Sequence, residues 1–259
     1  GALKLYLVGA VSSAILMFGA TLLFGLAGST SLVEIGSFAA MGATPLFLVG
    51  ATLLIAGMGF KLGLFPFHMW VPDTYEGAAT PYVTFLSIAP KAAGLIALIQ
   101  VLFTADRALL DVSFALLVLL TVTPLVAGNL PALPQSNVKR LLGYSGVAHM
   151  GFFIMAIACG TSEGLSSLLF YLVAYLGSNA GAFLVIHAAG GASMERFDGL
   201  SRRDGLLGMA MLLFMLSLGG IPFVAGFWAK LYVFLAAWGA GLEGLVILGA
   251  AMSVVGLFY

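Results

Sequence analysis

Long apolar runs separated by short polar turns dominate this chain. Several runs reach the roughly 20 residues that an α-helix needs to cross a hydrocarbon core of about 30 Å. Apolar length, read against Pro, Gly and charged breakers, predicts eight membrane-spanning helices. The expected spans are residues 4–27, 43–76, 79–103, 111–129, 141–160, 163–190, 205–238 and 243–259. The expected fold is therefore an all-α polytopic membrane protein.

Composition supports that class. Hydrophobic residues make up 62% of the chain and charged residues 8%, whereas a soluble domain carries about 25% charged residues. The net charge is zero and no basic stripe is present, which argues against a nucleic-acid partner. The one cysteine, Cys159, allows no disulfide framework and no cysteine-ligated cluster. No HExxH pattern suggests a metal either, so we expect no cofactor, no metal and no redox centre in this chain.

Residues 1–259 are expected to form a single transmembrane domain. The chain opens without Met and without a signal-peptide pattern, as if within a domain. We therefore expect it to be part of a longer protein.

Two expected spans, 43–76 and 205–238, are too long for one straight crossing, and both contain helix breakers. A broken helix at membrane depth is tolerated only where protein or a hydrated cavity satisfies its free backbone groups. The alternative is that two proline kinks fell there by chance, since Pro and Gly are frequent in membrane helices. The breaking residues are Pro66 in the first span and Gly219, Gly220 and Pro222 in the second.

The order of the two broken spans, second and seventh, means that they cross in opposite directions. This is the arrangement of inverted-topology repeats, with a transport path near the midplane. One repeat would include about residues 1–103, and the other about 111–259. Arg107 is the one cation expected at the other side, and the majority side should be cytoplasmic. The cations of that majority side are Lys4, Lys139, Arg140, Arg196, Arg202 and Arg203.

Three lysines, Lys61, Lys91 and Lys230, are expected near mid-membrane, whereas every acidic residue lies in a loop or at a span end. A lysine at the centre of a membrane helix costs about 2.5 to 3.5 kcal/mol. Desolvation favours the neutral amine, which would make each lysine a proton carrier. Alternatively, a carboxylate from another segment or subunit pairs with one of them. Snorkelling to the interface is the structural alternative, but Lys91 lies too far from either end of its helix for that.

Two histidines are candidate relay residues. His68 follows the break at Pro66, and His149 shares a helix face with Ser145 at an i, i+4 spacing. Each could equally be a packing residue with a satisfied hydrogen bond.

Three long segments carry a resemblance to a known family. They are "GFKLGLFPFHMWVPDTYEGAATPYVTFLSIAPKAAG" (59–94), "LPQSNVKRLLGYSGVAHMGF" (133–152) and "LSLGGIPFVAGFWAKLYVF" (216–234). Together they resemble the antiporter-like membrane subunits of respiratory complex I, the proton-pumping NADH:quinone oxidoreductase. The "YEGA.TP" turn and the "APK" around Lys91 look most like the subunit N group, called subunit 2 in mitochondria.

The resemblance implies a fold of about 14 helices with two inverted five-helix repeats, of which this chain would hold about the sixth to thirteenth. It implies that Lys61 and Lys230 belong to the broken helices, and that Lys91 connects them along a charged axis at the midplane. The family's partner for the first lysine is a glutamate on the helix before the one that opens this chain.

The resemblance also implies the biological setting. Electron transfer from NADH to quinone in other subunits would drive proton movement through this one. NAD, FMN, iron–sulfur clusters and quinone would belong to those other subunits. The partners would be other membrane subunits of complex I, including further antiporter-like subunits, together with protons and lipid. The location would be the bacterial plasma (inner) membrane or the equivalent organellar membrane.

Two other functions compete with this one. The chain could be a subunit of a cation/proton antiporter that exchanges sodium or potassium for protons. Sodium sites need clustered oxygen ligands, and no acid lies at mid-membrane here. An inert membrane scaffold is the other alternative, but it would leave the intramembrane lysines without a purpose.

Overall fold

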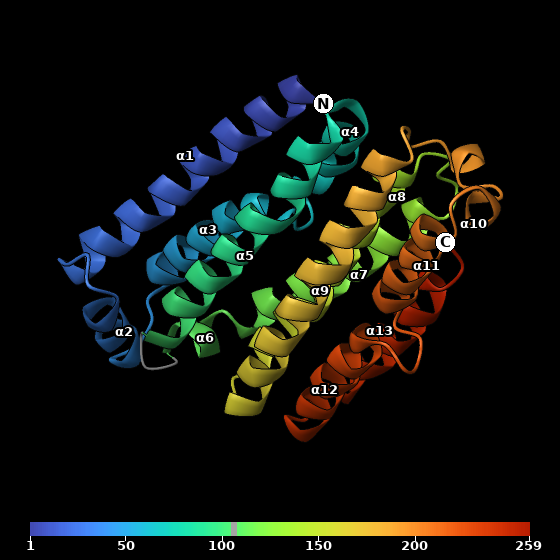
Figure 1. Cartoon of the computed structure of the whole chain (residues 1–259). Coiled ribbons are helices and arrows are strands. Elements are labelled where there is room, and N and C mark those ends of the chain that lie inside the picture. The colour runs from blue at the N-terminus through green and yellow to red at the C-terminus, as the bar shows by residue number, and fades with distance from the viewer. Residues whose placement is uncertain (105–107) are drawn as a thin grey trace.

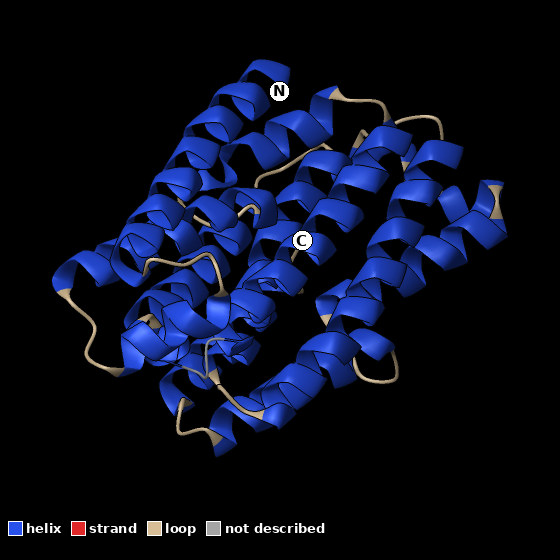
Figure 2. Ribbon diagram, turned by 90° about the vertical axis from the view of Figure 1, so that its left-hand side faces the viewer, coloured by secondary structure: helices blue, strands red, loops and turns tan. Residues whose placement is uncertain are grey.

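A computed structural model describes residues 1–104 and 108–259, and helices make up nearly all of this part of the chain (Figures 1 and 2). Arg107, expected as the lone cation of its side, lies outside the described residues. The helices are α1 (Ala2–Ala27), α2 (Leu32–Ala40), α3 (Pro45–Leu62), η1 (Phe67–Met69), α4 (Trp70–Gly77), α5 (Thr80–Thr104), α6 (Ala108–Val112), α7 (Phe114–Ala132), α8 (Val138–Ala158), α9 (Ser162–Ala188), η2 (Met194–Arg196), α10 (Leu200–Arg203), α11 (Gly205–Gly219), α12 (Ala225–Gly239) and α13 (Glu243–Gly256).

The chain is a multi-pass membrane protein. Within the described residues, six helical stretches are long and apolar enough to cross a membrane, and α11 and α13 are shorter apolar helices. The expected span at 205–238 is present as two helices, α11 and α12, of 15 residues each. Eight expected spans thus correspond to five single helices of spanning length, the two broken pairs α3/α4 and α11/α12, and the short α13. The sequence reading missed α2, whose Ile35 and Ala39 are buried.

Helix α8 is the centre of the bundle. All of its residues except Arg140 and Tyr144 are buried, as expected for a helix that is apolar on every side. Small residues bring α7 close: a Cβ on Gly128 would lie 2.4 Å from the backbone nitrogen of Ala148. The outermost position belongs to α1, which has three buried residues, Ser12, Gly19 and Leu23. Most of the remaining surface of α1 is apolar and suits lipid or another subunit.

Both discontinuous helices predicted from the sequence are present. Helix α3 ends before Gly63 (φ 71°), and α11 ends before Gly220 (φ 85°). Each glycine adopts the left-handed conformation of a Schellman C-cap. The matching capping bonds are Leu64 N–H to Gly59 C=O (2.8 Å) and Ile221 N–H to Leu216 C=O (3.0 Å). Pro66 and Pro222 then lie in the non-helical connections.

The two broken helices run in opposite directions (Figure 1). Helix α4 ends at the same end of the bundle as Lys4, because Asp73 contacts both Lys4 and Arg140. The loop that leads to α11 starts at that end too, because Ser193 pairs with Asn137. Four of the six majority-side cations predicted from the sequence lie in, or within three residues of, these joined segments: Lys4, Lys139, Arg140 and Arg196. Arg203 donates to the Arg196 carbonyl and so lies at the same end. An inverted repeat therefore agrees with the chain path.

Candidate functional site

Lys91 lies inside the bundle, on α5. Its side chain is 1% exposed. Its Nζ donates to the carbonyl of Gly146 on α8 (3.0 Å) and to the hydroxyl of Tyr175 on α9 (3.2 Å). A Cβ on Gly146 would lie 2.6 Å from that Nζ, so a larger residue at this position would displace the amine. None of the ion pairs among the described residues includes Lys91. The amine is therefore held by neutral oxygen atoms.

Lys230 lies in a comparable setting at the second break. It is 6% exposed, and its Nζ donates to the carbonyl of Gly219 (2.8 Å) and to the hydroxyl of Ser253 on α13 (3.0 Å). The Nζ also lies 5.2 Å from the centre of the Phe152 ring, a cation–π geometry. The Gly219 carbonyl belongs to the last turn of α11, where carbonyl groups lack intrahelical partners and favour a cation. The helix break thus supplies a ligand for the lysine.

His149 lies between these two lysines. It is 4% exposed, and its Nδ1 is 2.8 Å from the hydroxyl of Tyr171. Its ring centre is 5.0 Å from that of Tyr175, the residue that contacts Lys91. His149 also lines a cavity of about 240 Å³ together with Lys230. The polar lining is completed by Asn129, Ser145, Ser253 and Tyr259.

This cavity can hold water. Its volume of about 240 Å³ is several times the share of one water molecule in the liquid, and its lining offers several polar partners. Ser145 and His149, predicted to share a helix face, both line it. The structure therefore brings together Lys230, His149 and a hydratable space, with Lys91 reached through Tyr175.

Lys61 differs from the other two lysines. The sequence reading placed all three at membrane depth, yet Lys61 is exposed on the surface of this chain, whereas its neighbours Leu62, Gly63 and Leu64 are buried. Lys61 is in the last turn of α3, and its side chain points away from the helix face that packs against the bundle. That Lys61 lies near mid-membrane and takes part in proton transfer stays a prediction.

The region beside His68 forms a second polar site. His68 is half-buried and its Nδ1 has no hydrogen-bond partner among the described residues. It lines a pocket of about 200 Å³ with Lys4, Asp73, Arg140 and Tyr144. The structure does not bring His68 into the cavity of His149 and Lys230.

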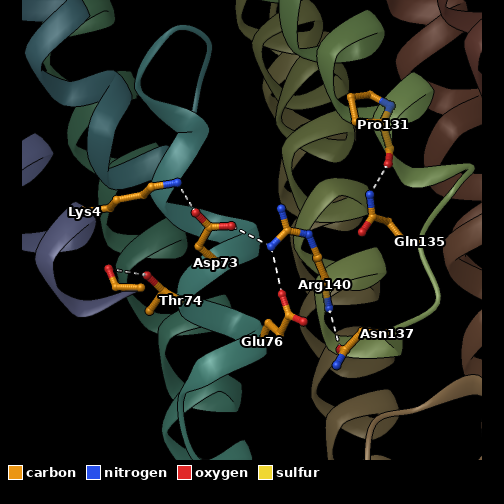
Figure 3. A network of polar contacts seen from close by, with 9 residues as sticks. Lys4, Asp73, Thr74, Glu76, Pro131, Gln135, Asn137 and Arg140 are labelled. Atoms are coloured by element: carbon orange, nitrogen blue, oxygen red, sulfur yellow. Dashed lines mark hydrogen bonds and ion pairs between the residues drawn. The ribbon is translucent and has the colours of Figure 1, made fainter.

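Ion pairs join Lys4, Asp73 and Arg140, which line this pocket (Figure 3). Asp73 lies between Lys4 and Arg140, with 2.6 Å from its Oδ1 to Arg140, and Arg140 also contacts Glu76 at 2.8 Å. Sequence reasoning missed this network, because the partners are far apart in the chain. The signal was present in α4, where an i, i+3 spacing puts Asp73 and Glu76 on one face.

Sequence reasoning also missed the polar groups on α9. Tyr171, Tyr175 and Asn179 recur every four residues, and all three are buried. This period places them on one helix face. The signals available were this spacing and the polar Asn179 inside an expected span.

Comparisons with known proteins agree with this architecture. The family model "NADH:quinone oxidoreductase/Mrp antiporter, TM" matches residues 1–256. The NAD(P)H-quinone oxidoreductase subunit 2 of Synechococcus elongatus is 43% identical over 263 residues, which cover 100% of this chain and 50% of that protein. The NADH-quinone oxidoreductase subunit N of Rhodospirillum rubrum is 39% identical over 264 residues, which cover 99% of this chain and 54% of that protein.

A solved structure shares the fold. A chain of respiratory complex I from Thermus thermophilus, determined with bound aureothin, superposes with a TM-score of 0.86 and 39% identity over 100% of this chain and 57% of that chain. The chain spans about half the length of the curated relatives that it matches. It belongs to the NADH:quinone oxidoreductase/Mrp antiporter transmembrane family.

Proposed function

We propose that this chain is part of a proton-translocating membrane subunit of an NADH:quinone oxidoreductase, of the subunit N (subunit 2) type. In this proposal, electron transfer to quinone in other subunits drives proton movement past the buried lysines. The observation that carries it is the pair Lys91 and Lys230, both buried and both bonded to neutral oxygen atoms. The family membership supports the assignment to a respiratory complex.

The chemistry follows from the surroundings of each amine. A charged lysine without a carboxylate in a low-dielectric interior is costly, and proton loss relieves that cost. Both lysines therefore suit a cycle in which a neutral amine takes up a proton and a charged amine releases it. Two charged amines in one interior also repel each other, so protonation of Lys91 favours proton release from Lys230. Water in the 240 Å³ cavity would carry the proton between Lys230 and His149.

Lys61 has a different role in the proposal. Its exposed position on this chain leaves it accessible to a carboxylate of another segment or subunit. Such a pair would stabilise the charged amine, and breaking the pair would release the proton. We propose that this is where a charge movement in a neighbouring part of the complex acts on the lysine axis.

The redox cofactors have no place in this mechanism. We propose that NAD, FMN, iron–sulfur clusters and quinone are bound by other subunits, and that this chain contributes coupling rather than electron transfer. The partners are then other membrane subunits of the complex, further antiporter-like subunits among them. The exposed apolar face of α1 is suited to lipid or to such a subunit.

A cation/proton antiporter subunit is the second candidate, because the matching family model includes Mrp antiporters. Its chemistry fits less well. A sodium site needs several oxygen ligands around one position, whereas the oxygen atoms that surround Lys91 and Lys230 are already bonded to the lysine amines. A charged lysine beside a metal cation would oppose binding.

The test uses the full-length subunit in its native membrane complex. Lys91→Ala and Lys61→Ala should each abolish NADH-driven proton pumping while the complex still assembles on a native gel. NADH oxidation by an artificial electron acceptor serves as the control, because it bypasses the membrane arm. Pumping at the normal ratio of protons to NADH in Lys91→Ala would refute the proposal. Sodium-dependent proton exchange without NADH would favour the antiporter.

A further inference from the structure

Two buried tyrosines of α9 have no role in the function proposed above. Tyr175 and Tyr171 are 2% and 1% exposed, and both hydroxyls are within hydrogen-bond distance of a titratable group. A buried tyrosine hydroxyl can bond a backbone carbonyl or pack without a hydrogen-bond partner. These two instead face Lys91 and His149, one turn of helix apart.

Tyr175 suits both protonation states of Lys91. A carbonyl such as that of Gly146 can only accept a hydrogen bond, whereas a phenol hydroxyl can donate and accept. When the amine is charged, it donates to the Tyr175 oxygen, as the structure shows at 3.2 Å. When the amine is neutral, its lone pair can accept the hydrogen of the same hydroxyl. Tyr175 is thus the one of the two ligands that can follow a change in the charge of Lys91.

Gly146 has no side chain, and this leaves room for the contact between Lys91 and Tyr175. A Cβ on Gly146 would lie 2.6 Å from the Lys91 amine and 3.0 Å from the Tyr175 hydroxyl oxygen. Alanine would therefore displace the amine, the hydroxyl or both. The close packing of the two groups depends on glycine at this position of α8.

Tyr171 acts on the histidine. Its hydroxyl lies 2.8 Å from Nδ1 of His149, and the two rings meet edge to face at 5.7 Å between centres. A partner on Nδ1 leaves Nε2 as the ring nitrogen available to water in the cavity that His149 lines. A hydrogen bond to one ring nitrogen sets the tautomer and so sets what the other nitrogen can do.

We propose that Tyr175 is the relay residue that exchanges a proton with Lys91, and that Tyr171 is a positioning residue for His149. The inference rests on the proposed function and names two residues within it. The transfer is balanced: one Nζ proton passes to the Tyr175 oxygen while the hydroxyl proton of Tyr175 passes to a water molecule, which the proposal places between this hydroxyl and the cavity that His149 lines. Lys91 becomes neutral, Tyr175 remains a phenol and one proton has moved on.

Substitutions that remove one oxygen atom test this. In the full-length subunit within its complex, Tyr175→Phe should slow NADH-driven pumping about tenfold, the effect expected of a lost hydrogen bond to a charged group. It should also change the pH dependence of pumping, which a packing role would leave unaltered. Tyr171→Phe should produce a smaller loss together with a changed pH dependence.

The matched control is Tyr75→Phe. Tyr75 on α4 is 0% exposed, and its hydroxyl has no hydrogen-bond partner among the described residues. This variant should pump at the normal rate. An equal loss in Tyr75→Phe and Tyr175→Phe would overturn the inference, and so would a normal rate and pH profile in Tyr175→Phe.

Two further readouts keep the test decisive. If Lys91→Ala abolishes pumping and Tyr175→Phe does not alter it, the inference fails while the proposed function stands. If Lys91→Ala pumps normally, the proposed function itself fails. Should Tyr175→Phe not assemble, infrared difference spectra of the unaltered complex with labelled tyrosine decide. A tyrosine C–O band that shifts over the pH range in which pumping changes supports the relay, and an invariant band overturns it.

Discussion

The two broken helices end in the same way, but their lysines differ in burial. Both α3 and α11 close with a glycine in the left-handed conformation and the same capping bond. Lys61 precedes its break and is exposed, whereas Lys230 follows its break and is buried against the Gly219 carbonyl. A break in a membrane helix therefore does not by itself bury a lysine. At the second break, the amine is buried because a carbonyl set free by the break faces it.

The two breaks are also held by different forces. Helix α4, after the first break, is tied to α8 by the ion pairs of Asp73 and Glu76 with Arg140 at one end of the bundle. Helix α12, after the second, is tied by buried hydroxyls. Ser178 donates to the Ser217 oxygen (2.7 Å), which in turn accepts the Gly226 N–H (3.2 Å). The second break is thus fixed by hydroxyls in the interior, whereas the first adds ion pairs at one end of the bundle to the buried face of α4.

The largest expected effect comes from the glycine of the second break. Gly220→Ala should abolish pumping and lower stability, because φ is 85° and the new Cβ would lie 2.9 Å from Cδ of Lys230. Gly63→Ala is the matched control, with φ of 71° and a Cβ 2.9 Å from Val71. It should cost only the left-handed strain and local repacking, about 1 to 2 kcal/mol for the strain. Pumping and thermal unfolding of the purified complex check this; equal pumping losses would mean that lysine placement is not what distinguishes the breaks.

A smaller effect is expected at the hydroxyl link. Ser217→Ala leaves the Gly226 N–H and the Ser178 hydroxyl without this partner, which should cost about 1 to 3 kcal/mol of stability. Ser37→Ala is a suitable control, since that exposed hydroxyl bonds within its own helix to Val33. Thermal unfolding measures both. A loss in the Ser37 variant as large as that in the Ser217 variant would remove the distinction between interior and peripheral attachment.

The smallest effect belongs to the ion pairs of the first break. Asp73→Asn should lower stability by about 1 kcal/mol or less, because partly exposed pairs contribute little. The loss should shrink as ionic strength rises, since salt screens such pairs. Unfolding at low and high salt checks this. A large loss that is independent of salt would place the attachment of α4 in the interior after all.

The sequence was sufficient for the parts of the fold that depend on apolar length. Residues 43–76 and 205–238 were too long for one crossing, and their glycines and prolines located the breaks. The directions of the lysine side chains could not be predicted in this way. A hydropathy pattern does not show that Lys61 lies on the outer face of α3 or that Lys91 points into the bundle.

The polar contacts of the site were the hardest to predict. Tyr175 meets Lys91 across 84 residues of sequence, and Asp73 meets Arg140 across 67. Such pairs depend on how the helices pack against each other, whereas a sequence pattern describes one helix at a time. The i, i+4 pairing of Ser145 and His149 was predictable because it lies within one helix.

The most direct test replaces Lys91 by a cation that keeps its proton. Lys91→Arg retains the positive charge and the donors, but an arginine side chain stays protonated in proteins. The measurement is the number of protons pumped per NADH oxidised by the assembled complex. The account predicts that Lys91→Arg loses pumping as Lys91→Ala does. A normal ratio in Lys91→Arg would contradict proton exchange at this buried amine.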